Sequence, residues 1–508
     1  MSEHAAGPGL ATDRAIGFMN GLDALFLYLE SPETPMHVGS MHLFEPPEGF
    51  IGDFAAAVRA HLGARLDRAD VLTRRLAPMP LGVANPAWIR AAEVDLDHHV
   101  RRLRLPPPGT MAQFHDLVGS LHARLLDRTR PLWEMVVVEG LQSGRIGFYA
   151  KVHHAGLDGQ AGVALAQAIY EVTARHGAAS VDGPAPAPVP ARDEPGAIRV
   201  AVAGLRHNAT QLVELGARLP GLARTIAQAV LPGVSGASAG ALLGGGDLLA
   251  PRTPLNVAIS RRRAFATVSV RLERARAIAP AHDASLNDVV LAACGDALRG
   301  WLDARGALPD APLLAAVPVS LRQKGDAQSN TQAMMARMSL ETQRDDPLER
   351  LRRIRDASTR LKGTLREVKG AVPTEFPSLG LPWLGNALAA VWGRTRLANR
   401  LPPLANIVVS NVPGPAVPLY LLGARMLTYW PVSIPVHSMA LNVTVQSYAG
   451  SLDFGLIACR RAVPDVDDIA ARIGAAFDAL ESAGAPPKRA PRRPARPRRR
   501  AAGDPEAA

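Results

Sequence analysis

The chain has 508 residues, of which 47% are hydrophobic and 20% charged, a balance that excludes a disordered or fibrous protein and is typical of a globular one. The two cysteines, Cys294 and Cys459, lie in apolar surroundings, which excludes a disulfide framework and fits a reducing cytoplasm. The net charge of +11 is uneven, because eight lysines or arginines fall within residues 486–500 and leave +3 for the rest.

The first part of the chain mixes strand and helix patterns and begins without the basic and apolar regions of a signal peptide. The runs WEMVVVEGL (133–141) and RIGFYAKVHH (145–154) are strand-like and are separated by three turn residues, which predicts a hairpin. Residues 159–177 follow with helical spacing and end at Gly177, a suitable C-cap. The segment between them, KVHHAGLDGQAG (151–162), therefore lies in a strand-to-helix turn.

A Pro/Ala-rich linker (181–197) then leads to a stretch with helical periodicity (198–231) and a flexible Gly/Ala/Ser segment (235–247). A second compact region, 251–478, contains a helix over 285–302 that Ser285 is expected to cap. The Ala-Gly-Ser junction at Gly450 predicts a hairpin turn. Further strands and a closing helix are expected at 262–272, 312–322, 404–412, 439–450, 451–461 and 463–484.

These elements predict an α/β (α+β) protein with mixed sheets flanked by helices. We expect four parts: residues 1–180 as a first domain, 181–250 as linker, helix and crossover, 251–480 as a second domain, and 481–508 as a disordered basic tail. No apolar stretch is long enough to span a bilayer. Residues 376–392, with two tryptophans, are either a buried helix or a shallow lipid contact. The tail either binds anionic lipid, binds nucleic acid, or has no partner.

The two histidines of the turn carry the chemistry that the sequence suggests. If the strand runs to His154, that residue extends the apolar face of Ile146 to Val152, whereas His153 lies on the other face. A desolvated His154 would be neutral and could accept a proton from a hydroxyl, because burial disfavours the charged ring. Asp158 could orient the ring or brace the turn. A purely structural turn and a zinc site stay open, although adjacent histidines on a strand point to opposite faces.

The segment HHAGLDG (153–159) resembles the HHxxxDG motif of CoA-dependent acyltransferases of the chloramphenicol acetyltransferase-like superfamily. Condensation domains of peptide synthetases share that motif, so other segments decide the branch. Seven further segments resemble the bacterial wax ester synthase/diacylglycerol acyltransferase family, and the similarity extends over nearly the whole chain up to about residue 478. These segments are LDALFLYLESPETPMHVGSMHLFE (22–45), RPLWEMVVVEGL (130–141), PLNVAISRRR (254–263), SLNDVVLA (285–292), VPVSLR (317–322), SNVPGP (410–415) and LNVTVQSYAGSLDFGLIA (441–458).

The resemblance implies two chloramphenicol acetyltransferase-like domains with an active-site channel between them. It implies transfer of a long-chain acyl group from acyl-CoA to diacylglycerol, to a long-chain alcohol, or to both. His154 is then the general base, His153 a supporting residue, Asp158 a structural aspartate and Gly159 a site of close packing. Lower in priority are four residues of two further family blocks, which we expect to be architectural: Pro131 and Trp133 of PLW, and Asn287 and Asp288 of ND.

The same resemblance implies no cofactor and no metal, since acyl-CoA is a substrate. The expected partners are acyl-CoA, the acceptor lipid and a peripheral membrane or lipid-droplet surface, with no specific nucleic acid. The expected location is the cytoplasm, at the inner membrane or at lipid inclusions. Two alternatives are open: a carrier-protein-dependent condensation enzyme, and a non-catalytic lipid-binding protein on the same scaffold. The sequence indicates neither the acceptor preference nor the oligomeric state.

Overall fold

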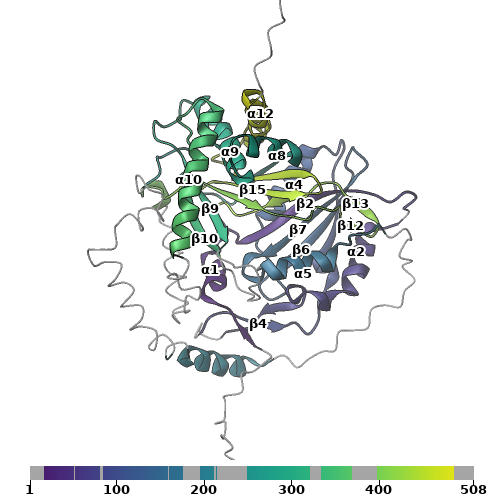
Figure 1. Ribbon diagram of the computed structural model, residues 1–508. Coiled ribbons are helices and arrows are strands. Elements are labelled where there is room, and N and C mark those ends of the chain that lie inside the picture. The colour runs from purple at the N-terminus through teal and green to yellow at the C-terminus, as the bar shows by residue number, and fades with distance from the viewer. Residues whose placement is uncertain are drawn as a thin grey trace, which may run out of the picture.

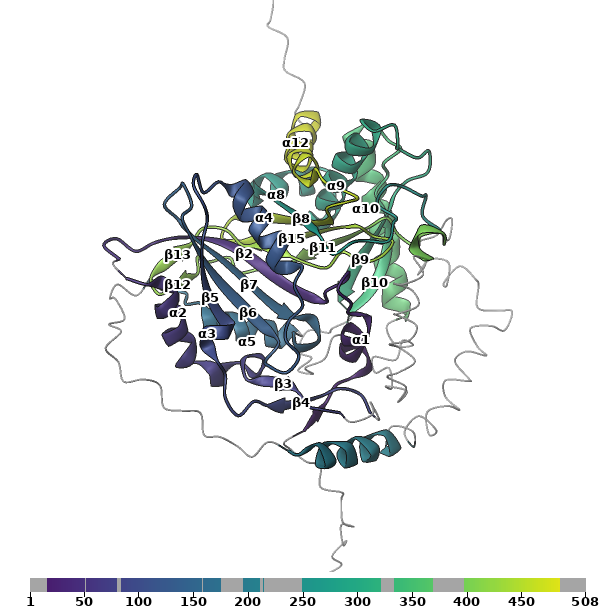
Figure 2. The ribbon, with the colours of Figure 1, turned by 180° about the vertical axis from the view of Figure 1, so that it is seen from behind.

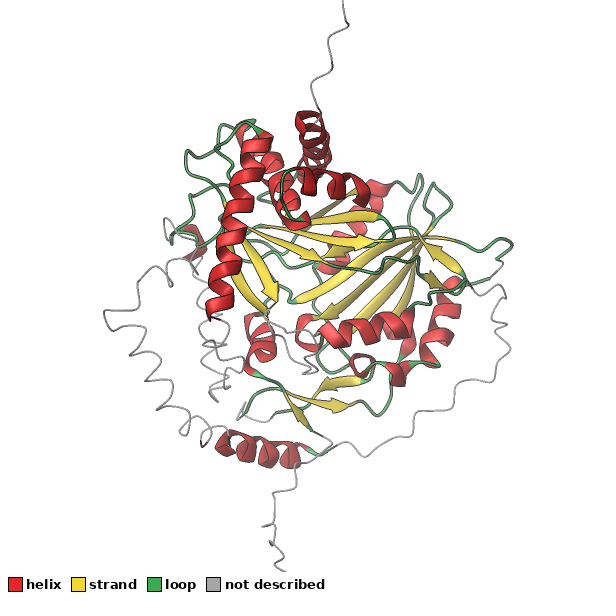
Figure 3. Cartoon of the chain, viewed as in Figure 1, coloured by secondary structure: helices red, strands yellow, loops and turns green. Residues whose placement is uncertain are grey.

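The computed structural model describes residues 16–50, 52–79, 84–157, 159–174, 195–210, 213, 249–320, 333–368 and 397–484. Three sheets organise these residues, with helices packed on their faces (Figures 1 and 3). The predicted mixed α/β architecture is confirmed. The stretches 175–194, 214–248, 369–396 and 485–508 lie outside the described residues, and with them most of the linker, the segment 376–392 and the basic tail.

The first large sheet has the strand order β12-β13-β2-β7-β6-β5, and β14 also pairs with β2. Strands β6 and β7 form the predicted antiparallel hairpin, in which Trp133 pairs with Val152, while β5 and β6 are parallel. Its strands from the N-terminal half are β2 (His37–Glu45), β5 (Val100–Arg104), β6 (Trp133–Glu139) and β7 (Ile146–His153). A small sheet of order β1-β4-β3 lies beside it and consists of β1 (Gly17–Phe18), β3 (Arg74–Leu76) and β4 (Ala87–Arg90).

The second large sheet has the order β10-β9-β11-β15-β16-β8 and is mixed, since β11 is parallel to both of its neighbours. Its strands are β8 (Arg263–Arg271), β9 (Leu314–Ser320), β10 (Ala333–Ser339), β11 (Ile407–Val412), β15 (Leu441–Tyr448) and β16 (Ser451–Cys459). Ala449 and Gly450 both have positive φ angles, 42° and 91°, in the predicted hairpin turn between β15 and β16. Glycine suits this conformation because it has no Cβ.

The C-terminal half of the sequence completes the first sheet. Strands β12 (Tyr420–Leu421), β13 (Ala424–Met426) and β14 (Trp430–Val432) all join that sheet rather than the second one. Met426 pairs with Phe44, and Trp430 pairs with Met41. The two halves of the sequence are therefore joined through a shared sheet.

Helices cover the sheets by burying apolar faces (Figure 2). Four helices pack on the second sheet in one aliphatic core: α8 (Leu272–Ala281), α9 (Leu286–Asp303), α10 (Pro347–Val368) and α12 (Val466–Gly484). On the first sheet, α2 (Phe54–Gly63) and α5 (Gly159–Ile169) cover one face. Helix α4 (Met111–His122) covers the other face, and the apolar cluster beneath α4 includes Phe265 of β8 and Ile457 of β16.

The short helices are α1 (Gly21–Leu29), α3 (Leu96–His99), η1 (Leu66–Arg68), η2 (Asp70–Leu72), η4 (His154–Gly156) and η5 (Leu397–Asn399).

Most predicted elements are confirmed, with two corrections near the motif. Ser285 caps α9 as expected, and both cysteines are buried and free. Strand β7 ends at His153, so His154 belongs to the turn η4 and strand alternation does not set its direction. Helix α5 ends at Ile169 instead of continuing to Gly177, because Glu171 exchanges backbone hydrogen bonds of 2.8 Å with Tyr420 of β12.

Candidate active site

The two histidines are held from both neighbours of β7. The backbone N–H of His153 donates to the carbonyl of Leu132, 2.9 Å away, just before β6. The backbone N–H of His154 donates to the carbonyl of Met36, also 2.9 Å away, just before β2. Because the two neighbouring segments bind successive residues, the chain turns at a fixed point, and the side chains of His153 and His154 leave the sheet in different directions.

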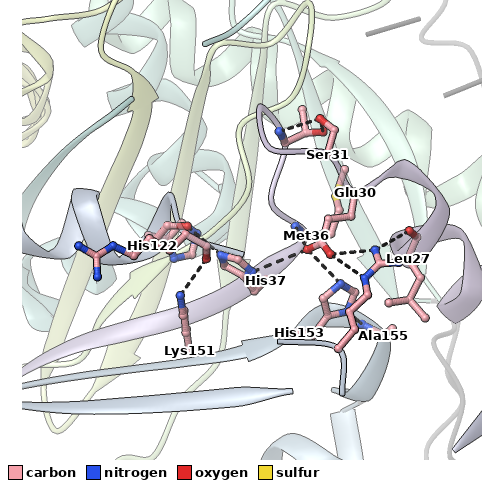
Figure 4. Close-up of polar contacts among 12 residues, drawn as sticks. Leu27, Glu30, Ser31, Met36, His37, His122, Lys151, His153 and Ala155 are labelled. Carbon is pink, nitrogen blue, oxygen red and sulfur yellow. Dashed lines mark hydrogen bonds and ion pairs between the residues drawn. The ribbon is translucent and has the colours of Figure 1, made fainter. Parts of the chain in front are cut away.

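His153 is fully buried and faces Glu30, the residue that follows α1 (Figure 4). Its Nδ1 accepts a hydrogen bond of 3.1 Å from the backbone N–H of Ala155, so its proton lies on Nε2, 3.3 Å from Oε1 of Glu30. Burial alone would raise the pKa of Glu30, but His153, Arg128 and the N–H of Met36 lower it to about 2. The Glu30 carboxylate on one side and the Ala155 N–H on the other thus fix the His153 ring.

The same carboxylate is the edge of a larger buried polar network (Figure 4). His37 lies beside Glu30, with 3.9 Å between Nδ1 and Oε1, and its Nε2 is 2.7 Å from the carbonyl of His122. The ammonium of Lys151 donates to the carbonyl of Leu121 over 2.8 Å. The last carbonyls of α4 are thus bound by donor side chains of β2 and β7, which satisfy acceptors that a helix leaves unpaired at its C-terminus. This arrangement ties α4 to the two strands that lead to the motif.

His154 has a different environment. Its imidazole stacks on the ring of Phe26 from α1, with 3.9 Å between centroids and 14° between planes. Burial is the main cause that lowers its pKa from 6.5 to about 4, so the ring is uncharged at neutral pH. Its Nδ1 is buried and has no hydrogen-bond partner among the described residues. The structure thus places an uncharged imidazole against an aromatic ring at the end of β7.

A pocket of about 770 Å³ lies next to this turn. It touches Ala155 and Gly156, the two residues that follow His154, although the His154 side chain does not line it. Its lining combines apolar side chains, such as Trp88, with charged ones, such as Asp67 and Arg68. This combination suits an amphiphilic molecule.

The other predicted residues lie around this centre or away from it. Asp158 lies outside the described residues, and Gly159 is the first residue of α5. Pro131 is buried just before β6. Trp133 is 1% exposed, donates from Nε1 to the carbonyl of Leu72 over 3.1 Å, and stacks on His99. PLW thus occupies the core beside the motif.

Asn287 and Asp288 lie in the first turn of α9, on the second sheet. Asp288 forms a capping box, since its Oδ2 accepts from the N–H and the hydroxyl of Ser285 at 2.8 and 2.7 Å. Its Oδ1 is buried without a hydrogen-bond partner among the described residues. Asn287 is half-buried. No hydrogen bond between described residues joins this pair to the histidine motif.

Two side chains of the site, Glu30 and Phe26, are not predicted by the sequence. Both belong to the segment 22–45, whose resemblance to the family is noted above, but nothing in the sequence assigns either residue a role. The described residues contain no group of three His, Cys, Asp or Glu side chains that could hold a metal ion. His153 and His154 face different neighbours, Glu30 and Phe26. Within the same ranges, no helix is both long and apolar enough to cross a membrane.

Comparisons with known proteins give a consistent result. The sequence model described as "Wax ester synthase/diacylglycerol acyltransferase catalytic domain" matches residues 19–290, and "WS/DGAT C-terminal domain" matches residues 330–481. A putative diacylglycerol O-acyltransferase of Mycobacterium tuberculosis H37Rv is 36% identical over 466 residues, covering 92% of this chain and 99% of the relative. A probable diacylglycerol O-acyltransferase of the same organism is also 36% identical, covering 91% and 98%.

Solved structures agree with the sequence relatives. The wax ester synthase/diacylglycerol acyltransferase from Marinobacter aquaeolei VT8 superposes with a TM-score of 0.65 and 30% identity, covering 92% of this chain and 100% of that one. The first condensation domain of the CDA synthetase superposes with a TM-score of 0.51 at 15% identity, covering 93% and 98%. At that identity, the second likeness concerns the fold alone.

Proposed function

The chain belongs to the wax ester synthase/diacylglycerol acyltransferase family and is an acyl-CoA-dependent acyltransferase; we propose that His154 is its general base and diacylglycerol its preferred acceptor. The observation that carries the role of His154 is the place of its uncharged imidazole, at the end of β7 and next to the two residues, Ala155 and Gly156, that line the pocket. A base must be unprotonated at the working pH, and this imidazole fulfils that condition at neutral pH. We assign the reaction to Nε2, because Nδ1 is buried.

The proposed reaction is a direct transfer in which the base moves one proton. His154 takes the proton of the acceptor hydroxyl while that oxygen attacks the thioester carbonyl carbon. The tetrahedral intermediate collapses, the carbon–sulfur bond breaks, and the imidazolium returns its proton to the departing CoA sulfur. The ester and free CoA are the products, and His154 is again neutral. This scheme needs no cofactor, because acyl-CoA is consumed as a substrate.

The neighbouring residues support this role by fixing the turn. The carboxylate of Glu30 faces the Nε2–H of His153, and Ala155 donates to its Nδ1, so His153 cannot rotate without breaking both contacts. We propose that His153 and Glu30 are positioning residues that hold the backbone from which His154 projects. Pro131, Trp133, Asn287 and Asp288 have architectural roles in this proposal, and Asp158, which lies outside the described residues, has the structural role that the family resemblance implies.

The acceptor proposal rests on the relatives and on the pocket beside Ala155 and Gly156. The relatives above carry the name diacylglycerol O-acyltransferase, and the pocket is lined by both apolar and charged side chains. We propose that the acceptor enters through this pocket and that the active site lies in a channel between the two halves of the chain. We also propose a peripheral location at the inner membrane or at lipid inclusions, because diacylglycerol and long-chain alcohols are insoluble in water and are found there.

A competition experiment tests the acceptor proposal. The purified protein is incubated with palmitoyl-CoA and equal amounts of hexadecanol and dipalmitoylglycerol, and the products are separated. We expect both esters, with triacylglycerol in excess. Wax ester in excess would reverse the proposed preference. Transfer only from an acyl carrier protein, with none from palmitoyl-CoA, would favour a condensation-type enzyme instead.

A further inference from the structure

We propose that the helix formed by residues 197–210 docks on an anionic phospholipid surface through an exposed apolar stripe. The inference rests on the proposed function and deepens it, because it names the surface by which the chain would reach a membrane-dissolved acceptor. The helix is drawn in teal at the lower edge of Figure 1. It lies directly beneath the small sheet that contains β4.

Four large apolar side chains form the stripe. Ile198, Val202, Leu205 and Val213 are 83%, 44%, 57% and 74% exposed. The spacings of four and three residues place Ile198, Val202 and Leu205 on one face of the helix, together with the exposed Ala209. A contiguous exposed apolar face is unusual on a soluble protein surface and indicates an interaction site.

The opposite face of this helix already packs against the protein core, so the exposed stripe is not the face that the fold buries. Val200 is 0% exposed and belongs to the core of the small sheet. A Cβ on Gly204 would lie 2.9 Å from the Cβ of Ala84, which shows how closely the helix approaches the chain there. His207 stacks on Phe18 with 4.3 Å between ring centroids and 6° between planes. The helix is therefore fixed on one side and presents apolar side chains on the other.

The charges beside the stripe indicate which kind of partner binds there. Arg199 and Arg206 are both exposed and, seven residues apart, lie along one edge of the stripe, and residues 195–210 contain no acidic side chain. Anionic lipid headgroups complement such an edge. Membrane insertion by 5–10 Å requires only one apolar helix face. A stable dimer, by contrast, uses about 20–30 residues per subunit, whereas the stripe consists of four large side chains.

The position of the helix connects the docking face to the active site. Phe18, which stacks on His207, also lines the pocket of about 770 Å³ that reaches Ala155 and Gly156. Phe18 therefore belongs to the small sheet, contacts the helix and lines the pocket. A lipid that leaves a bilayer at the stripe would meet this pocket next to the turn that carries His154.

A local probe tests the docking face in the full chain. Both native cysteines are buried, so Leu205→Cys provides an exposed thiol for an environment-sensitive fluorophore. Leu404→Cys, at a side chain that is 68% exposed and outside the helix, is the matched control. On addition of phosphatidylglycerol-containing vesicles, we expect a blue shift and quenching by brominated lipid at position 205 but not at 404. Because the probe is local, adhesion through the basic tail alone would leave position 205 in water. An unchanged emission at 205 would overturn the proposal.

A charge substitution gives the second test. Ile198→Glu combined with Leu205→Glu should weaken vesicle binding about tenfold or more, because two apolar side chains can no longer be buried. Leu404→Glu should not. The double variant should keep its turnover of a short-chain acyl-CoA with a soluble alcohol and lose turnover of diacylglycerol in vesicles.

The result is separable from the proposed function, since vesicle binding is measured without substrates. Absence of turnover in the unmodified protein would remove the acyl-transfer proposal and leave the binding result standing. Wild-type binding by the double variant would overturn the docking face. Light scattering that shows a dimer dissociated by the double variant would also overturn it, because the stripe would then be a contact between two copies.

Discussion

The imidazole of His154 and the phenyl ring of Phe26 lie face to face, with 3.9 Å between their centroids and 14° between their planes. The stack joins the first helix of the chain, α1, to the turn that follows β7. It excludes water from one face of the imidazole, and burial lowers the His154 pKa to about 4. The stack therefore orients the proposed base and is part of the burial that keeps it neutral.

Replacing Phe26 with Ala should raise the pKa of His154 from about 4 toward 6.5, because water then solvates the imidazolium. The base works only when neutral, so activity is lost as pH falls through this pKa. The acidic limb of the kcat/KM profile should accordingly move to higher pH in Phe26→Ala. Phe26→Leu keeps an apolar cover and should move the limb less. Identical acidic limbs in the wild type and in Phe26→Ala would contradict the role assigned to the stack.

Replacing Glu30 with Gln should destabilise the protein and slow the reaction. The Glu30 side chain is 3% exposed and contacts His153, Arg128 and the N–H of Met36. We expect a loss of about 1–3 kcal/mol in the free energy of unfolding, measured by urea denaturation, and a lower kcat. Glu33→Gln is the control, since that carboxylate is 37% exposed and pairs with Arg261. An effect on stability no larger than that of Glu33→Gln would contradict the positioning role.

Acid should destabilise the fold through its buried neutral histidines. Burial lowers the pKa of His42, His99 and His154 to about 4 and that of His122 to about 3. In the unfolded chain these groups titrate near 6.5, so between about pH 6.5 and 4 the unfolded state binds more protons. Their stabilising contribution is complete above pH 6.5 and is lost as pH falls, by about 1.4 kcal/mol per pH unit for each group. Urea denaturation at pH 7 and pH 5 measures this, and equal free energies would contradict it.

Replacing Gly455 with Ala should destabilise the contact between the two large sheets. A Cβ at this position of β16 would lie 1.7 Å from the carbonyl oxygen of Pro431 in β14, which the backbone cannot accommodate without moving. We expect a clear fall in thermal stability, of about 1–3 kcal/mol as for other overpacked sites. Gly363→Ala in α10, where nothing lies within 4 Å, should be neutral or stabilising. Equal melting temperatures for the two variants would refute this packing argument.

Local signals in the sequence predicted local structure well. The alternation in 133–154 and the short turn within it are sufficient for the β6–β7 hairpin, and Ser285 with Asp288 specifies the start of α9. The histidine motif was likewise placed correctly between a strand and a helix. These features depend on residues close together in the chain, which is why pattern and capping rules capture them.

Contacts distant in sequence could not be predicted in the same way. Glu30 and Phe26 reach the motif only because α1 packs against η4, and their spacing within 22–45 is that of any amphipathic helix. Strands β12 to β14 have two or three residues each, too few for a periodic signal, so their pairing with β2 was not visible. The backbone N–H of His154 donates to the carbonyl of Met36 where β7 ends. The side chain of His154 therefore does not follow the strand alternation from which its direction was predicted.

The most direct test of the proposed mechanism is CoA release by His154→Ala, measured with palmitoyl-CoA and dipalmitoylglycerol. General base catalysis accounts for about 10²- to 10⁴-fold in rate, so kcat should fall by at least about 100-fold. Circular dichroism and the melting temperature should stay near those of the wild type, because the His154 side chain makes no hydrogen bond through its buried Nδ1 among the described residues. A folded His154→Ala protein that releases CoA at the wild-type rate would contradict the assignment of the base.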